Sequence, residues 1–454
     1  MILDLKAIIL KKLPAWIVST LGLLFFAFVF VRWAVAEKPS AAQLAAAICS
    51  LALFLIGCVR FVPGWISFLF ERREEPRVGP EPKFALLGVA ALAVTVELVL
   101  FVVTDRIRVA RGGAETFAGA IGFWDYPDGS HYLDIAREWY LSDADAGRVV
   151  QLVFLPGYPI AVYPLYRIFN NDVLAGLIVS GVSFPAACCV LYRLLRLDYD
   201  HSRAFRTVVM LLMLPGTFFF LAPMSESLYL LLALSTLYAA RKKHWMLAGL
   251  FGAYTAFTRT VGLLLVAPLI LEWIRAFPKE KTGRAKWVLG LVPAVMVPLG
   301  FLGYLYINYT VSGNPLQFLV YQRDHWGQSL GWFFNTAAYQ TGDLIENLTQ
   351  HNRELSFGLW LPNVVSHFAV LALFALTAKK LRPSYTAWFI GYFVIAIGAT
   401  WLLSGPRYLL SMPAVAMMLA ACTEKRRQQA VAVLILVPLS LLYLTAYVLR
   451  WQVW

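Results

Sequence analysis

The segment FALLGVAALAVTVELVLFVVT, residues 84–104, decides the fold class of this chain. Its only ionisable residue is Glu97, and a helical apolar run of this length crosses the roughly 30 Å hydrocarbon core of a bilayer. A helix satisfies its own backbone hydrogen bonds, which lipid cannot do. The segment therefore predicts a transmembrane helix.

Comparable apolar runs recur along the whole chain of 454 residues. Only 14% of the residues are charged, against about 25% in soluble proteins, and the mean hydropathy is +0.67. We therefore expect an all-α polytopic membrane protein with about thirteen transmembrane helices. The expected spans are residues 13–36, 41–62, 84–104, 173–192, 206–222, 226–240, 245–258, 261–274, 287–309, 360–378, 385–403, 408–422 and 429–449.

The distribution of charge predicts the orientation of these helices. The net charge of +13 comes largely from Lys and Arg in short loops between apolar runs, a positive-inside pattern that argues against nucleic acid as a partner. We expect these loops on the cytoplasmic side together with the N-terminus: residues 71–83, 193–206, 241–244, 275–286, 378–383 and 424–427. Two long loops, 105–150 and 310–359, carry more acids than bases and are expected on the other side.

The five cysteines do not indicate a disulfide framework or a cysteine-based metal site, because they lie in or beside apolar segments. They are Cys49, Cys58, Cys188, Cys189 and Cys422.

The first long loop contains the polar stretch FWDYPDGSHYLDIAREWY at residues 123–140. Three interpretations are open here: an ordered surface loop, a metal site formed by Asp125, Asp128 and His131, or a catalytic carboxylate held at the membrane surface. The Pro127–Gly129 turn would present Asp128 close to His131 and Tyr132. The residues that follow have the spacing of a short amphipathic helix, whose apolar face would hold Tyr132, Ile135, Ala136 and Trp139.

Three charged residues lie at the outer ends of apolar runs. Glu226, in the sequence SES at 225–227, is either an acid in a capped first helical turn or a carboxylate that holds sugar hydroxyls. Arg259 and Arg407 either extend toward the membrane surface or form a clamp for a phosphate, which a guanidinium binds through two parallel hydrogen bonds.

Two further segments combine aromatic and polar residues. The stretch GNPLQFLVYQRDHWG at 313–327 contains Gln322, Arg323 and Trp326, which suit either an amphipathic loop helix or a pocket for a sugar or lipid headgroup. The stretch VFLPGYPIAVYPLYRIF at 153–169 has three prolines that would repeatedly interrupt a helix, so we expect an interfacial or re-entrant element.

Taken in order, these segments resemble the membrane mannosyltransferases of the PIG-V type, the second GPI mannosyltransferase and its bacterial relatives, within the GT-C superfamily. The resemblance covers roughly residues 84–425. It consists of the DGSHY loop, FLPGYP, SES, an Arg-x-x-Gly-Leu segment, NPLQF followed by Gln322 and by Trp326–Gly327, and PRY. It implies a two-span N-terminal extension at 1–83, a GT-C-like catalytic domain at 84–425 and a C-terminal span at 426–454.

The resemblance implies a catalytic base. In that family the acid directly before Gly-x-His/Trp-Tyr is the expected base, and it corresponds to Asp128. The Trp that normally precedes this acid stands three positions earlier, beside Asp125, so Asp125 remains the alternative base.

The resemblance also implies an activity, namely inverting transfer of mannose or a related hexose from a polyprenyl-phosphate donor to a lipid or glycan acceptor. Arg259 or Arg407 would neutralise the lipid phosphate, while Glu226, His131, Tyr132, Gln322, Arg323 and Trp326 would bind the acceptor or the sugar. No cofactor is expected, and dependence on a divalent metal is left open. The active site would lie on the non-cytoplasmic side of a bacterial plasma membrane, or of the endoplasmic reticulum in a eukaryote.

Two other classes of function remain as alternatives. Transporters and flippases for lipid-linked sugars also have many spans and buried charges, although no inverted repeat is evident in the sequence. A non-catalytic subunit of a glycosylation complex would share the topology without needing a reactive acid.

Overall fold

The structure, a computed structural model, describes residues 2–71, 79–141, 150–276 and 289–454, and within these ranges it is helical without a β-sheet. Parts of the expected loops 71–83, 105–150 and 275–286 lie outside the described residues. Seven helices in the described part of the chain are long and apolar enough to cross a membrane: Leu13–Glu37, Ala41–Phe70, Ala85–Ala110, Asp172–Leu195, Val292–Ser312, Glu354–Thr377 and Arg426–Val448. The chain is an integral membrane protein, and the predicted all-α class is confirmed.

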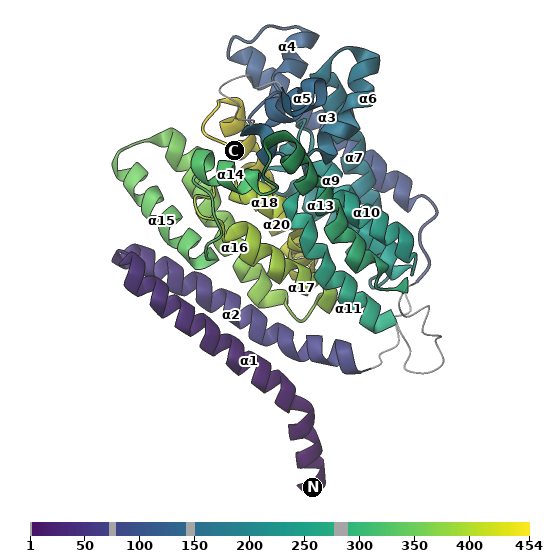
Figure 1. Cartoon of the computed structure of the whole chain (residues 1–454), viewed down its shortest axis with the longest axis vertical. Helices are drawn as coiled ribbons and strands as arrows, with labels where there is room; N and C mark the ends of the chain where they lie inside the picture. Colours follow the sequence, from purple (N-terminus) through teal and green to yellow (C-terminus); the bar gives the residue numbers. More distant parts are fainter. Residues whose placement is uncertain (1, 72–78, 142–149, 277–288) are drawn as a thin grey trace.

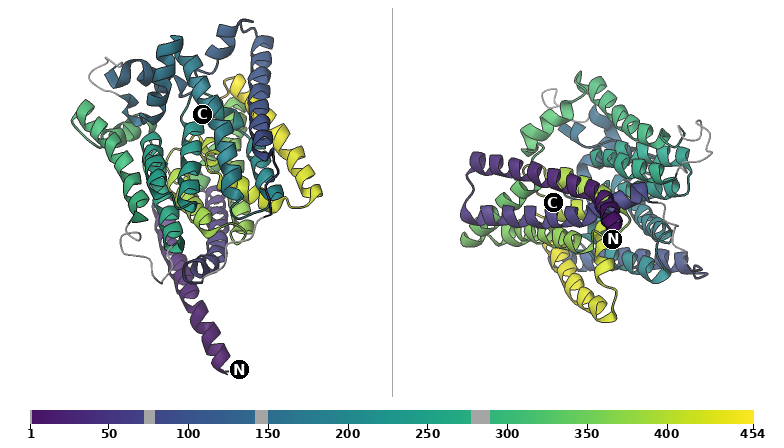
Figure 2. Two further views of the ribbon diagram at one scale, coloured as in Figure 1. Left: turned by 90° about the vertical axis from the view of Figure 1, so that its right-hand side faces the viewer. Right: turned by 90° about the horizontal axis from the view of Figure 1, so that it is seen from below.

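The N-terminal helices form a hairpin along one side of the molecule (Figure 1). α1 (Ile2–Glu37) and α2 (Ala41–Phe70) pack together, and the first turns of α1 extend beyond the other helices (Figures 1 and 2). Ser40 begins α2 because its hydroxyl accepts a hydrogen bond from the Gln43 amide. α2 then packs against α15 (Phe333–Thr349) and α16 (Leu361–Thr377), which joins the hairpin to the rest of the bundle.

The centre of the bundle is built around α9 (Glu226–Arg241), most of whose residues are buried. It packs against α7 (Asp172–Leu195) and α10 (Trp245–Thr258), and α10 packs in turn against α13 (Val292–Ser312). α3 (Ala85–Ala110) lies against α7. The remaining long apolar helix is α20 (Arg426–Val448).

Short helices occupy the two long loops, as the sequence predicts. The first loop forms α4 (Phe117–Gly122) and α5 (Gly129–Glu138), and the second forms α14 (Gln317–Trp326) and α15. α4, α5 and α6 (Gly157–Phe169) lie together at the upper end of Figure 1. On α5, Tyr132, Ile135 and Ala136 are buried as expected, but Trp139 ends the helix with a positive φ and is 36% exposed, so its place on the apolar face was wrong.

Proline divides two of the expected spans. The run 206–222 becomes α8 (His201–Met213) and a 3₁₀ turn at Thr217–Phe220, because Pro215 holds Leu214 extended and Gly216 has a φ of 96°. The run 408–422 becomes α18 (Gly405–Leu410) and α19 (Ala414–Cys422) around Pro413.

Two other expected spans contain irregular helical turns. The expected run 261–274 begins with a 3₁₀ turn, Thr260–Leu265, before α11 (Val266–Ala276). The run 385–403 becomes α17 (Pro383–Tyr392), followed by a π-helical turn at Phe393–Ile397.

The expectation that prolines repeatedly interrupt residues 153–169 was wrong. α6 runs without a break from Gly157 to Phe169. Pro156 precedes the helix and Pro159 lies in its first turn, where an amide has no intrahelical partner to lose. Only Pro164 removes a helical hydrogen bond.

The loops expected on opposite sides of the membrane gather at opposite ends of the bundle. Arg241, the last residue of α9, forms an ion pair with Asp198, and Arg382 forms one with Glu272. All four residues lie in or beside the basic loops. Glu226, the first residue of α9, lies at the other end with the acidic loop that contains Asp128. α9 separates these two ends by about 24 Å, given a rise of about 1.5 Å per residue.

Candidate functional site

A buried arginine, Arg407, connects two acids at the end of the bundle where the acidic loops lie. Its Nη2 donates a 2.6 Å hydrogen bond to Oδ2 of Asp128, and its Nε lies 2.8 Å from Oε1 of Glu226 in an ion pair that lacks hydrogen-bond geometry. Arg407 lies in the short helix α18, whose first amide, that of Gly405, donates to Oδ1 of Asn363 on α16. The neighbouring helix α16 thereby fixes the turn that carries the guanidinium.

A second arginine holds the same glutamate. Arg259 has extended backbone between α10 and the 3₁₀ turn that follows, and its Nη1 lies 2.5 Å from Oε1 of Glu226. The Glu226 side chain is fully buried. Burying a charge is costly unless it is paired, and here Asp128, Glu226, Arg259 and Arg407 balance in charge. The sequence predicted these four residues as site residues, and the structure brings them into one cluster.

Aromatic rings surround the two guanidinium groups. The Arg259 guanidinium lies 5.8 Å from the ring of Tyr229 and 5.2 Å from that of Tyr408, and Arg407 lies 5.8 Å from the ring of Phe219. Such contacts stabilise a desolvated cation. The sequence pattern does not single out these rings, although Tyr408 directly follows Arg407 and Tyr229 lies one helical turn after Glu226.

Tyr132 reaches the cluster through Ser225. The Tyr132 and Ser225 hydroxyl groups are 2.9 Å apart, and Arg259 Nη1 lies 3.4 Å from the same serine oxygen. Ser225 precedes α9, but its side chain makes no capping hydrogen bond to that helix. The predicted acid in the first helical turn is confirmed, since Glu226 begins α9 behind Ser225, but the Ser225 hydroxyl group contacts the charged cluster and does not cap the helix.

The two candidate bases occupy different environments. The Asp128 side chain is 24% exposed and touches Arg407, so it lies between the buried cluster and the surface. Asp125 is exposed and makes no ion pair with any of the residues that the structure describes. Although the residue as a whole is exposed, nearby protein atoms displace part of the water around the Asp125 carboxyl. This desolvation, followed by repulsion from Asp172 and Asp134, raises the pKa of the carboxyl above its usual value.

The two long loops meet through Phe154. Its ring stacks on His131 with centroids 4.6 Å apart and contacts Trp326 edge-on at 6.0 Å. Trp326 belongs to α14, so residues of three sequence segments come together around the Phe154 ring. Phe154 lies in the stretch 153–169, but the sequence analysis did not name it as a site residue.

The remaining predicted residues lie farther out. Gln322 donates from its side chain to that of Gln328 within the second loop. Arg323 is 68% exposed and pairs with its neighbour Asp324, so the structure does not bring it into the cluster. Within the described ranges, no three His, Cys, Asp or Glu side chains, Asp125, Asp128 and His131 included, are arranged to hold a metal ion.

Several polar atoms of the cluster are buried without a hydrogen-bond partner in the described part of the chain. They are Nη1 of Arg407, Oε2 of Glu226, the hydroxyl oxygen of Tyr229 and Nδ1 of His131. Buried polar groups are normally satisfied, and those that are not need an explanation, such as a ligand. A guanidinium nitrogen of this kind can donate to an anionic ligand such as a phosphate.

A second buried network, which the sequence analysis missed, lies at the other end of α9. Arg382 lies 3.0 Å from Asp198 and 2.7 Å from Glu272, and Arg241 lies 2.6 Å from Asp198. The residues come from the expected cytoplasmic loops and the adjoining helix ends, where the positive-inside pattern gave an orientation but no pairing. In each network, ion pairs join residues from segments that are far apart in the sequence.

No protein-family model matches this sequence, and no curated protein matches it either. Among solved structures, ArnT from Cupriavidus metallidurans bound to undecaprenyl phosphate is 16% identical, with a TM-score of 0.44 over 80% of this chain and 76% of that one. The Archaeoglobus fulgidus oligosaccharyltransferase tethered with an acceptor peptide is 13% identical, with a TM-score of 0.42 over 82% of this chain and 55% of that one. TM-scores below 0.5 at such low identity assign neither a fold family nor a function to this chain.

Proposed function

We propose that this protein is a GT-C-type glycosyltransferase that moves mannose or a related hexose from a polyprenyl-phosphate donor to a lipid or glycan acceptor. The contact between Arg407 and Asp128 carries the proposal, because it places a partly exposed carboxylate beside a buried cation with a nitrogen that no described residue bonds. The order of motifs that resembles the PIG-V-type mannosyltransferases supports the same reaction class. The transfer takes place on the non-cytoplasmic face, where the charge pattern of the loops puts Asp128.

The reaction is a single displacement at the anomeric carbon. Asp128 accepts the proton of an acceptor hydroxyl while the oxygen attacks the sugar on the face opposite the phosphate. The bond between the anomeric carbon and the phosphate oxygen breaks, and polyprenyl phosphate leaves with the electron pair. The new glycosidic bond therefore has inverted configuration, and one essential carboxylate suffices because the leaving phosphate is already ionised.

Arg407 is assigned to the phosphate in preference to Arg259. Arg407 touches the partly exposed Asp128 and has a nitrogen without a hydrogen-bond partner among the described residues, whereas Arg259 is held by Glu226 and Ser225. A fixed cation at the point where negative charge develops lowers the barrier without further reorganisation. Glu226 and Arg259 hold Arg407 in place.

Tyr132, His131 and Trp326 are assigned to the sugar or the acceptor. Tyr132 is held by a hydrogen bond with Ser225. His131 from the first long loop and Trp326 from the second both contact the Phe154 ring. Aromatic walls with a few convergent polar atoms are typical of ligand pockets. Gln322 and Arg323, from the same helix as Trp326, are assigned to the outer part of the acceptor.

The test separates transfer from transport. Purified full-length protein is reconstituted into liposomes with polyprenyl phosphate carrying radiolabelled mannose, together with membrane lipid extract as acceptor. A transferase consumes the donor and yields free polyprenyl phosphate in equal amount to labelled product. A flippase moves intact donor between leaflets with no release of polyprenyl phosphate, and that result would overturn the proposal.

A further inference from the structure

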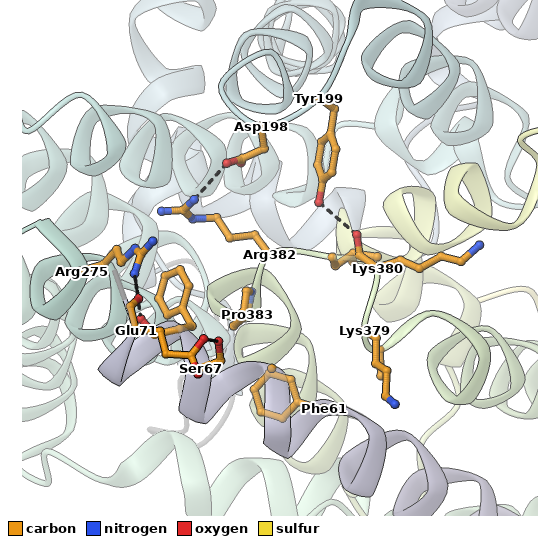
Figure 3. A pocket seen from close by; sticks show the side chains of 14 residues that line it. Phe61, Ser67, Glu71, Asp198, Tyr199, Arg275, Lys379, Lys380, Arg382 and Pro383 are labelled. Carbon is orange, nitrogen blue, oxygen red and sulfur yellow. Dashed lines mark hydrogen bonds and ion pairs between the residues drawn. The ribbon is translucent and has the colours of Figure 1, made fainter. Parts of the chain in front are cut away.

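A pocket of about 310 Å³ lies at the end of the bundle opposite Asp128 (Figure 3). One wall is the C-terminal end of α2, with Phe61, Ser67 and Phe68, and the facing wall includes the loop from Ala378 to Arg382. Arg275, near the end of α11, and Asp198, which follows α7, complete it. The pocket therefore lies where the N-terminal hairpin meets the remaining helices.

The helix ends place this pocket at the membrane surface. α2 ends at Phe70, α11 at Ala276 and α16 at Thr377, while α17 begins at Pro383. The ends of apolar helices mark the boundary between hydrocarbon and headgroups. A ligand in the pocket would thus lie at the level of lipid headgroups, on the side where the basic loops gather.

The lining is more basic than acidic. It contains Arg275, Lys379, Lys380 and Arg382 against Glu71 and Asp198. Asp198 and Arg382 belong to the balanced buried network with Arg241 and Glu272, so their charges cancel within it. The basic excess is therefore carried by the side chains around the opening of the pocket.

Part of the basic wall is fixed in advance. The guanidinium groups of Arg275 and Arg382 lie 5.3 Å and 5.1 Å from the ring of Phe68, and Arg275 donates to the backbone oxygens of Phe68 and Glu71. These contacts hold both guanidinium groups at the end of α2, and of the two, Arg275 lies outside the balanced network that contains Arg382. A cation fixed in this way binds an anion with a smaller entropic cost.

Two flexible cations lie in the loop that faces α2. Lys379 and Lys380 are exposed, and their amino groups extend outward from the loop (Figure 3). Lys380 donates to the Ala421 carbonyl at 2.9 Å and lies 3.4 Å from Glu424, an exposed ion pair of the kind that is worth little. Both amino groups can therefore turn toward a ligand at the opening.

We propose that this pocket binds the phosphate group of an anionic membrane lipid and thereby fastens the N-terminal hairpin to the remaining helices. Basic pockets between membrane helices on the cytoplasmic side recognise lipid phosphates. The same chemistry suits a soluble phosphate, but the headgroup depth and the apolar surface of Phe61 and Phe68 match the phosphate and upper chain of a lipid. The site is separate from the proposed transferase site and needs no sugar donor.

The test measures lipid retention by native mass spectrometry on the delipidated full-length protein. Phosphatidylglycerol, phosphatidylcholine and glycerol 3-phosphate are added in separate titrations. We expect phosphatidylglycerol to bind at least about tenfold more tightly than phosphatidylcholine, because each basic group near the surface favours anionic lipid. The double variant K379Q/K380Q should lose most of this preference.

The matched control is K242Q/K243Q, which removes two exposed lysines at the same end of the bundle but outside the pocket. It should keep the wild-type preference. Three results would overturn the proposal: no preference for phosphatidylglycerol, an equal loss in both double variants, or binding of glycerol 3-phosphate as tight as that of phosphatidylglycerol. The last result would assign the pocket to a soluble anion.

Discussion

Arg407 and Asp128, 279 positions apart in the chain, are held together by a 2.6 Å hydrogen bond between a guanidinium nitrogen and a carboxylate oxygen. The arginine is buried, whereas the acid is partly exposed. Arg407 also faces the buried Glu226, so a single side chain joins the protein interior to the candidate base. The proposed chemistry depends on this arrangement.

Replacement of Arg407 by Met should lower both activity and stability. Among the described residues, the variant leaves Glu226 paired with Arg259 alone. It also removes the proposed phosphate ligand. Breaking a buried ion pair costs about 3–5 kcal/mol, and loss of a stabilising cation should reduce the transfer rate by about 100-fold or more. Thermal unfolding in detergent and donor turnover measure the two effects separately.

Two variants calibrate this prediction. R407K keeps the charge but not the forked geometry that reaches two carboxylates, so its activity should remain low while part of its stability returns. R106M removes an exposed arginine near the end of α3, paired with Glu115, and should change neither quantity appreciably. Wild-type turnover in R407M would contradict the proposal that Arg407 stabilises the leaving phosphate.

Replacement of His131 by Phe tests whether its nitrogen serves a ligand. The aromatic stack on Phe154 is kept, while the buried Nδ1, which has no hydrogen-bond partner in the described part of the chain, is lost. We expect kcat/KM to fall about tenfold with little change in the unfolding temperature, since a lost hydrogen bond to a ligand costs about 1–2 kcal/mol. The matched variant H325F alters an exposed histidine on α14. Equal kinetics in both variants would argue that His131 only packs.

Replacement of Gly300 by Ala tests the close packing of α10 and α13. A Cβ atom at this position would overlap the backbone carbonyl of Ala253, which cannot move as a side chain can. We expect a loss of about 1–3 kcal/mol in stability, visible as a lower unfolding temperature. Gly88 on α3 has open space around it, so G88A should be neutral or slightly stabilising. An unfolding temperature for G300A at or above that of G88A would contradict this packing.

The helical class followed from the sequence because a continuous apolar run such as 84–104 can satisfy its own backbone hydrogen bonds in lipid as a helix. The sequence also selected Glu226, Arg259 and Arg407 as charged residues at the outer ends of apolar runs, and Asp128 from its turn and from the motif resemblance. Which acid meets which arginine depends on the packing of α5, α9 and α18, which periodicity does not reveal. The interruptions at Pro215 and Pro413 altered helix boundaries without changing the class.

Other features of the site depended on tertiary structure. Phe154 looked like one apolar residue among many, and only the fold brings it between His131 and Trp326. Arg323 lies in a segment whose aromatic and polar residues are typical of a ligand pocket. In the structure, however, its side chain on α14 points to the surface. The PIG-V-type specificity and the identity of the base stay predictions.

The most direct measurement compares single-turnover transfer by the variants D128N and D125N in proteoliposomes supplied with labelled mannosyl polyprenyl phosphate. D128N removes the proposed base and should lower the transfer rate by about 100-fold to 10,000-fold. The fold should be retained with a lower unfolding temperature, because the buried Arg407 loses one of its two acids and keeps Glu226. D125N should retain most of the activity, because Asp125 is exposed and makes no ion pair with the described residues. Wild-type transfer by D128N, or its loss in D125N alone, would contradict the assignment of Asp128 as the base.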